Sequence, residues 1–223
     1  MGVPRVITGS SIAAPAAAWK PTLSGVYSQR LLEEGLLLKK EGIRNAKNGA
    51  PWQEWDTPLY SYSVPLKTCG ETLAFDKYLQ NLSLGNGQFV VVDVGFGSGR
   101  QWRKFLCENR QIEFWGTALF MERVMASMKK RAVMCSAGAI DLVFPEGYVD
   151  FLASHFGFHR EADLFASAIA SVLKENGEAV VTARRDEIRI FEGAVPKTRL
   201  EVIGVEKGLG NNPKFSVHLR KMA

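Results

Sequence analysis

A buried strand, three alternating glycines and a helix follow one another near the middle of the chain. Residues 89–94 read Phe-Val-Val-Val-Asp-Val, with apolar side chains toward both faces, as in a strand inside a parallel sheet. Gly95, Gly97 and Gly99 come next, followed by a segment at 100–108 whose apolar residues have helical spacing. Glycine lacks the Cβ that would block a ligand, and a helix start offers free N–H groups. The pattern predicts a ligand site after a central strand, with a ligand-free turn as the alternative.

Strand and helix patterns alternate along the rest of the chain. Strands are expected at 112–117, 132–136, 149–154 and 179–183. Helices are expected at 72–82, 119–131 and about 161–174. Such alternation is typical of a parallel sheet with helices on both faces.

The C-terminal tail breaks this alternation. Two strand patterns, at 199–205 and 214–219, are separated by the short glycine-rich segment 207–213. A parallel crossover needs a dozen or more residues, so this pair must be antiparallel. The sequence therefore predicts an α/β fold: a doubly wound, mostly parallel seven-stranded sheet with helices on both faces and a C-terminal antiparallel hairpin.

The first 69 residues differ in composition, and we expect an N-terminal extension (1–69) followed by one domain (70–223). Residues 1–32 contain no Asp or Glu, which is typical of a flexible arm and also of an organellar transit peptide. A basic helix is expected within 24–47. The aromatic loop at 52–62 favours attachment of the extension to the domain, with stacking on a nucleobase as the alternative.

Charge is unevenly distributed in this chain of net charge +5. Residues 100–131 hold eight Lys and Arg against three Asp and Glu, whereas residues 132–173 hold one against five. A basic segment of this kind is able to follow the phosphates of a nucleic acid, although two solvated helix faces would have the same composition. RNA or a ribonucleoprotein is therefore one candidate partner.

Cysteine and histidine usage limits the remaining classes. Cys69, Cys107 and Cys135 are far apart and odd in number, which disfavours a disulfide framework and a zinc site. We expect an intracellular, reducing location, cytoplasmic or mitochondrial, and no bound metal. No apolar run approaches the roughly 20 residues of a membrane-spanning helix, so no membrane partner is expected.

The glycine loop and two later turns resemble those of a known enzyme family. The residues from Asp93 to Gly99 resemble the first motif of the class I S-adenosylmethionine-dependent methyltransferases. Residues 144–151 and 172–180 resemble that family's turns into its fourth and fifth strands. The likeness covers about residues 70–223 and implies a Rossmann-like methyltransferase that uses S-adenosylmethionine. The cofactor-binding positions implied by it are Asp93, Gly95, Phe96, Gly97, Ser98, Gly99, Ala118, Leu119, Ala139 and Ser154.

Two positions depart from the family pattern. The family commonly ends its second strand with an acid that holds the ribose hydroxyls, where this chain has Thr117 or Ala118. A further acid often follows the third strand, where this chain has Ala139 and, slightly later, Asp141. The loss of two polar anchors predicts a degenerate cofactor site with weakened binding.

Catalytic residues are not defined by the sequence. Methyl transfer from a sulfonium depends mainly on alignment, so a base is optional. His155 and His159 follow the fourth parallel strand and are candidate bases, with a packing or capping role as the alternative.

Three functions are consistent with these features. The first is a methyltransferase acting on RNA or on an RNA-associated protein. The second is an inactive methyltransferase-like fold that serves as a binding or assembly module in a larger complex, with a ribonucleoprotein as one option. The third is a small-molecule methyltransferase.

Overall fold

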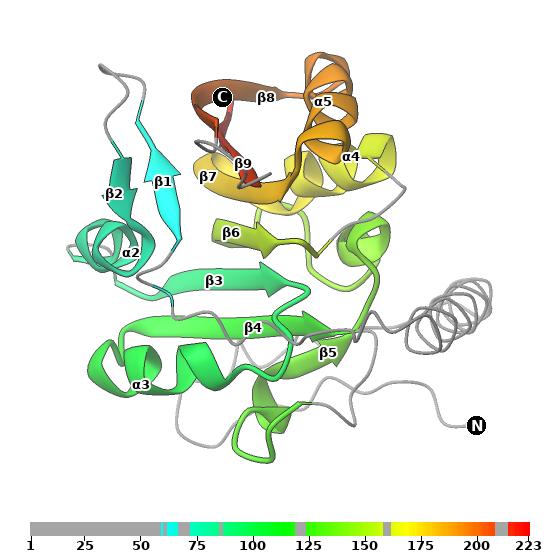
Figure 1. Ribbon diagram of the computed structural model, residues 1–223. Coiled ribbons are helices and arrows are strands. Elements are labelled where there is room, and N and C mark those ends of the chain that lie inside the picture. Colours follow the sequence, from blue (N-terminus) through cyan, green and yellow to red (C-terminus); the bar gives the residue numbers. More distant parts are fainter. Residues whose placement is uncertain are drawn as a thin grey trace, which may run out of the picture.

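The computed structural model describes residues 59, 62–66, 72–84, 87–118, 124–157, 162–207 and 214–223. Within these residues a sheet of seven strands has helices on both faces (Figure 1). The expected basic helix within 24–47, the two tryptophans of the aromatic loop and the arm at 1–32 lie outside the described residues. None of the described helices is long and apolar enough to cross a membrane.

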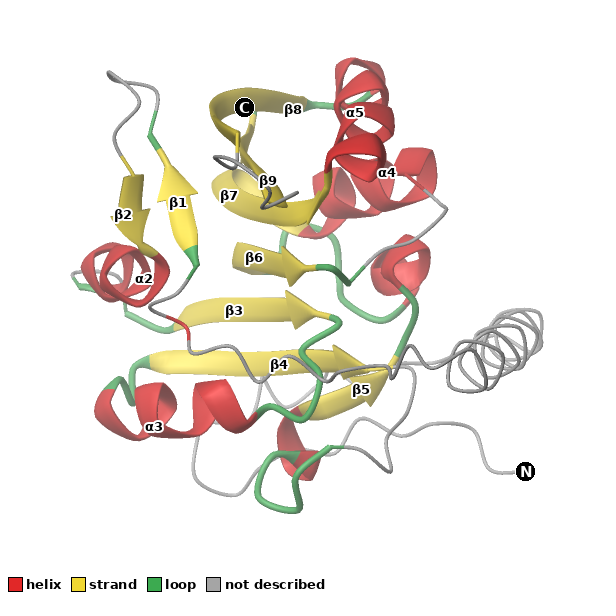
Figure 2. Cartoon of the chain, in the orientation of Figure 1, coloured by secondary structure: helices red, strands yellow, loops and turns green. Residues whose placement is uncertain are grey.

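The order of strands across the sheet is β5-β4-β3-β6-β7-β9-β8. In that order they span Ala132–Met134, Ile112–Ala118, Phe89–Val94, Val149–His155, Leu173–Arg184, Lys214–Lys221 and Leu200–Lys207. The first five run parallel, and β9 is antiparallel to both β7 and β8. The predicted mostly parallel sheet and its C-terminal hairpin are confirmed, as the arrows in Figure 2 show.

Two apolar cores lie on opposite faces of the sheet. All six residues of β3 are buried, and its alternate side chains enter different cores, with Val90, Val92 and Val94 in one and Phe89 and Val91 in the other. The helices α4 (Ala162–Val172) and α5 (Arg185–Ala194) and the 3₁₀ segment η4 (Ala137–Leu142) cover the first face. The helices α2 (Phe75–Ser83) and α3 (Arg100–Glu108) cover the second.

The structure corrects several expected elements. The segment expected to be a helix at 72–82 begins as strand β2 (Thr72–Ala74), because these residues pair with β1 (Ser63–Pro65). The described part of the expected helix at 119–131 consists of turns and the short η3 (Lys129–Arg131), since the Met125 N–H donates to Ser98 O outside any helix.

Two further elements near the C-terminus also differ. Helix α5 was not predicted, although Ile188, Phe191 and Ala194 give it a buried face. Strand β7 starts before the predicted 179–183, and it includes Asn176 in the left-handed region (φ +62°). The short η5 (Val195–Lys197) follows α5.

Leu59 and residues 62–66, at the end of the expected extension, pack on the domain. Leu59 and Val64 are buried in the second core. The Pro65 carbonyl lies 3.0 Å from His218 Nδ1 of β9, and Ser63 Oγ donates to the Glu206 carboxylate of β8. These contacts hold β1 against the antiparallel end of the sheet.

Candidate ligand site at the carboxyl edge of the sheet

The strand order places a topological switch point beside β3. From β3 the chain moves to β4 on one side, and it later crosses to β6 on the other side. The loops that follow β3 and β6 therefore leave the sheet toward opposite faces. In open α/β sheets a ligand binds at this switch point, outside the carboxyl ends of the strands.

The glycine loop after β3 is held by the end of β4. The amides of Gly95 and Phe96 both donate to the carbonyl of Thr117, over 3.0 and 3.1 Å. Gly95, Gly97 and Gly99 all have φ between +63° and +77°, a region that disfavours other residues. The alternation of glycine seen in the sequence is therefore a requirement of this backbone.

Phe96 supports the loop from below. Its side chain is 1% exposed and packs so closely on Gly99 and Gly116 that a Cβ at either glycine would lie about 2.5 Å from the ring. The Phe96 carbonyl accepts hydrogen bonds from Gly99 N–H and from the Gln101 side-chain amide. Only the main chain of Phe96 remains on the ligand side of the loop.

Gly97 is the open point of the loop. It is exposed, and among the described residues no atom lies within 4 Å of the place a Cβ would take. A ligand is thus able to reach bare main chain here without displacing a described side chain. Open main chain of this kind is expected where a ligand binds at a switch point.

The loop after β6 touches the glycine loop directly. A Cβ on Gly95 would be 2.5 Å from the Gly157 Cα, and a Cβ on Gly157 would overlap the Val94 carbonyl. Between β6 and Gly157, Phe156 adopts φ +59°, and its N–H donates to Thr182 O over 2.7 Å. A bulky residue in this region is strained, and such strain clusters at functional sites. The ring of Phe156 is 40% exposed at this edge.

Ser154 lies beneath the contact between these two loops. Its hydroxyl is fully buried, and it has no hydrogen-bond partner among the residues that the structure describes. A buried polar group without a partner costs about 1–3 kcal/mol, so its presence here indicates a position selected for something other than stability.

Asp93 is the penultimate residue of β3, directly before the loop. Its side chain is 3% exposed and accepts a hydrogen bond from the Trp102 indole N–H over 2.5 Å. Burial raises the pKa of Asp93 to about 7, against the opposing effect of the Trp102 hydrogen bond. Its contact with α3 shows that Asp93 braces the loop from within the core.

Small, buried side chains occupy the end of β4 and the η4 segment that follows β5. Ala118 is 7% exposed and Ala139 is 3% exposed, and Thr117 is completely buried. In the described part of this edge no carboxylate stands at these positions, and Asp141 is exposed on η4. This edge of the sheet therefore presents small side chains at the positions where the resemblance led us to expect carboxylates.

The two histidines named from the sequence have different outcomes. His155 stacks on Tyr62 with ring centroids 3.5 Å apart, and it meets the edge of Phe75 at 5.2 Å. Its Nδ1 lies 3.2 Å from Thr182 Oγ1, which is itself 2.8 Å from Ser216 Oγ. His155 is thus packed among aromatic rings on the α2 side. His159 and Leu119 lie outside the described residues.

Several residues that shape the site were not identified from the sequence. They are Trp102, Gly116, Phe156 and Gly157. A glycine in the middle of a buried strand, as at Gly116, and a glycine directly after a strand, as at Gly157, are signals of close packing. The left-handed conformation of Phe156 has no sequence signal.

Comparison with known proteins gives fold neighbours alone. No protein-family model matches the chain, and no curated protein sequence matches it. A TehB-like SAM-dependent methyltransferase from Corynebacterium glutamicum is similar in structure, with a TM-score of 0.51 at 15% identity over 86% of this chain and 99% of that one. TrmN from Thermus thermophilus has a TM-score of 0.53 at 15% identity over 70% of this chain and 50% of that one.

A third neighbour was solved with a cofactor product. Geranyl diphosphate C-methyltransferase from Streptomyces coelicolor, in complex with S-adenosyl-L-homocysteine, has a TM-score of 0.51 at 13% identity over 66% of this chain and 75% of that one. The strand order, the left-handed glycine loop after the central strand and these neighbours lead to the same conclusion. The chain has the fold of the class I S-adenosylmethionine-dependent methyltransferases.

Proposed function

We propose that the chain is a methyltransferase that binds S-adenosylmethionine over the glycine loop. The open, left-handed main chain at Gly97, at the switch point between β3 and β6, is the observation that carries this proposal. When bound, S-adenosylmethionine supplies a methyl group on a positively charged sulfur, which makes the leaving group good without acid catalysis.

Each implied position has a distinct task in this proposal. The main chain of Gly95, Phe96, Gly97, Ser98 and Gly99 approaches the ligand, while Ala118 and Ala139 form apolar walls for the adenine, with Leu119 expected beside them. Asp93 stabilises the loop through Trp102. Ser154 is available as a donor or acceptor if the loop carrying Gly157 moves away from Gly95. Catalysis then consists of aligning the acceptor with the methyl group.

For the acceptor we propose RNA or a protein bound to RNA. The supporting observation is the excess of Lys and Arg in residues 100–131, which starts directly after the glycine loop. A small-molecule acceptor would need no such excess of positive charge.

The test compares two glycines of the same backbone conformation at opposite edges of the sheet. Gly97 has φ +63° and Gly147 has φ +64°, and at both a Cβ would meet no described atom within 4 Å. An arginine at either site strains the backbone by about 1–2 kcal/mol. Only Gly97→Arg fills the proposed ligand site, because Gly147 precedes β6 at the amino edge.

Isothermal titration with S-adenosylmethionine and with S-adenosylhomocysteine gives the answer. We expect Gly97→Arg to weaken binding by roughly 100-fold or more, equivalent to about 3 kcal/mol, and Gly147→Arg to leave it unchanged. Transfer of a labelled methyl group to cellular RNA should follow the same order. Equal affinities in the two variants would place the ligand elsewhere, and no binding to the unmodified chain at millimolar ligand would refute the proposal.

A second candidate function is that of an inactive binding module. It is favoured by the absence of carboxylates at Thr117, Ala118 and Ala139 and by the direct contact of Gly95 with Gly157. In that case the chain binds its partner, and the titration shows no binding of S-adenosylmethionine or of S-adenosylhomocysteine.

A further inference from the structure

Basic side chains gather on one surface beside the glycine loop. The surface consists of α3, the residue after it and the segment around η3, and it is called the α3 basic surface below. Its cations are Arg100, Arg103, Lys104, Arg110, Lys129, Lys130 and Arg131. Six of the seven are exposed, and Arg131 is half-buried.

Little negative charge opposes these cations. Across 100–110 and 124–131 the single acid is Glu108, which lies 3.8 Å from Lys104 one helical turn away. The next acid, Glu113, is buried and accepts hydrogen bonds from Gln88, Trp115 and Tyr148, so it faces the core. The surface thus has a strong net positive charge.

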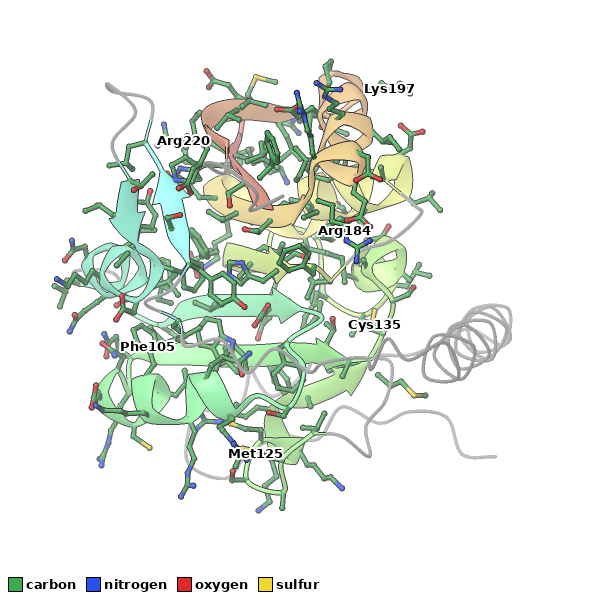
Figure 3. The ribbon with its side chains drawn as sticks, in the orientation of Figure 1. Phe105, Met125, Cys135, Arg184, Lys197 and Arg220 are labelled. Atoms are coloured by element: carbon green, nitrogen blue, oxygen red, sulfur yellow. The ribbon has the colours of Figure 1, made fainter. Side chains whose placement is uncertain are left out.

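The two parts of this surface are in contact. The Met125 N–H donates to the Ser98 carbonyl over 3.0 Å, and the Met128 side chain packs against Gly99. Figure 3 shows Met125 beside α3, with nitrogen-tipped side chains around both pointing away from the sheet.

The surface begins at the proposed methyl-transfer site. Arg100 directly follows Gly99, and α3 extends from there for about 13 Å along the face of the sheet. A polymer bound along α3 therefore has one part at the carboxyl edge, beside the open Gly97. This is the arrangement needed to bring one unit of a long acceptor to the switch point.

The chemistry of the surface favours RNA over other anionic partners. Guanidinium groups pair with phosphate oxygens through two hydrogen bonds, and neutralising several phosphates releases bound counterions. An anionic membrane would require apolar side chains among the cations, and no exposed large apolar residue lies on α3 or at 124–131. We propose that the α3 basic surface binds the phosphates of RNA and directs the acceptor nucleotide to the glycine loop. The placement of the acceptor rests on the proposed function, whereas the binding itself does not.

The test uses two matched triple variants of the full chain. Arg103→Gln/Lys104→Gln/Arg110→Gln removes three charges from the α3 basic surface. Arg189→Gln/Lys197→Gln/Arg199→Gln removes the same three charge types from exposed positions on and after α5. Figure 1 shows α5 at the opposite end of the molecule from α3. The probe is a fluorescein-labelled single-stranded RNA of mixed sequence, followed by anisotropy over a range of KCl concentrations.

We expect the α3 variant to bind RNA at least tenfold more weakly, and the slope of log K against log salt to fall by about 2. The α5 variant should bind within about twofold of the unmodified chain. Both variants should bind S-adenosylhomocysteine as the unmodified chain does. Equal RNA affinities in the two variants would overturn the proposal, and so would equally strong competition by polyglutamate, which would indicate an acidic protein partner.

The same titrations separate this inference from the proposed function. If the unmodified chain binds RNA through α3 and does not bind S-adenosylhomocysteine, the surface is established and the enzymatic proposal fails. If it binds S-adenosylhomocysteine while RNA binding is insensitive to α3, the enzymatic proposal stands and the surface is refuted.

Discussion

Two buried carboxyl groups in this molecule have opposite electrostatic environments. Asp93, under the glycine loop, accepts one hydrogen bond, from Trp102, and burial raises its pKa to about 7. Glu178, on β7, accepts hydrogen bonds from Tyr78, His218 and Arg220. Burial alone would raise the pKa of Glu178 as well, but these three donors together lower it to about 2.

The same contrast extends to the surroundings of each group. At the carboxyl edge, three glycines and Phe156 are in the left-handed region, and the Ser154 hydroxyl is buried without a partner. Around Glu178 the donors come from α2 and β9, and His218 Nδ1 also contacts the Pro65 carbonyl of β1. The first region keeps unfavourable features that a ligand site explains, whereas the second region joins the elements of the domain.

The largest loss of stability is expected for Glu178→Gln. The substitution leaves His218 and Arg220 facing a neutral amide in place of a buried carboxylate, which should lower the free energy of unfolding by about 3 kcal/mol. Because the pKa of Glu178 is about 2 in the folded state and its ordinary value is 4.5, its contribution is present above pH 4.5 and is lost as the pH falls toward 2. Urea unfolding at several pH values measures this difference.

Glu175→Gln is the control, because Glu175 is exposed on the same strand. It should change stability by less than about 0.5 kcal/mol. If Glu178→Gln lowered the free energy of unfolding by less than about 1 kcal/mol at neutral pH, the contacts of Glu178 with its three hydrogen-bond donors would not be a source of stability.

Asp93 should contribute to the stability of the protein with the opposite pH dependence. Asp93→Asn should stabilise the protein by about 2–4 kcal/mol at pH 8, because the buried charge is removed while an acceptor for the Trp102 indole is kept. The folded-state pKa of Asp93, about 7, lies above its ordinary value of 3.8. The folded wild type therefore binds more protons between these values, and its stability falls as the pH rises from 4 to 7. The advantage of the variant should disappear near pH 4, as urea unfolding will show; an advantage that grows on acidification contradicts the assignment.

The smallest expected effect on stability concerns strain. Phe156→Gly removes a left-handed strain of about 1 kcal/mol, so the melting temperature should be maintained or raised even though a ring is lost. If the ring belongs to the acceptor site, methyl transfer should fall by roughly tenfold, or about 1.4 kcal/mol. Asn176→Gly is the matched control: φ is +62°, and the residue lies at the amino edge. A similar loss of activity in both variants would exclude a role for the Phe156 ring.

Local patterns in the sequence were sufficient for the frame of the fold. Residues 89–94 and 100–108 form the expected strand and helix with the expected bounds, because their apolar spacing is satisfied within each segment. The antiparallel hairpin followed from the length of one linker. By contrast, residues 124–131 carry helical spacing but are held in turns by contact with the glycine loop, a tertiary effect that no local pattern contains.

The candidate site was predictable in its position but not in its detail. The alternation of glycines located it after β3. The contact between Gly95 and Gly157 joins residues 62 positions apart, and the hydrogen bond from Trp102 to Asp93 crosses from helix to strand. The first arises only once the sheet brings β3 and β6 together, and the second only once α3 packs on β3, so neither could be inferred from spacing along the chain.

Amide resonances of the glycines provide the most direct test of the central claim. A titration of S-adenosylhomocysteine into the ¹⁵N-labelled chain should shift the cross-peaks of Gly97 and Gly99, while Gly147 and Gly177 at the opposite edge stay in place. Shifts confined to the glycine loop would agree with an adenosyl ligand lying on open main chain at the switch point. Shifts at the other glycines alone, or none at millimolar ligand, would contradict it.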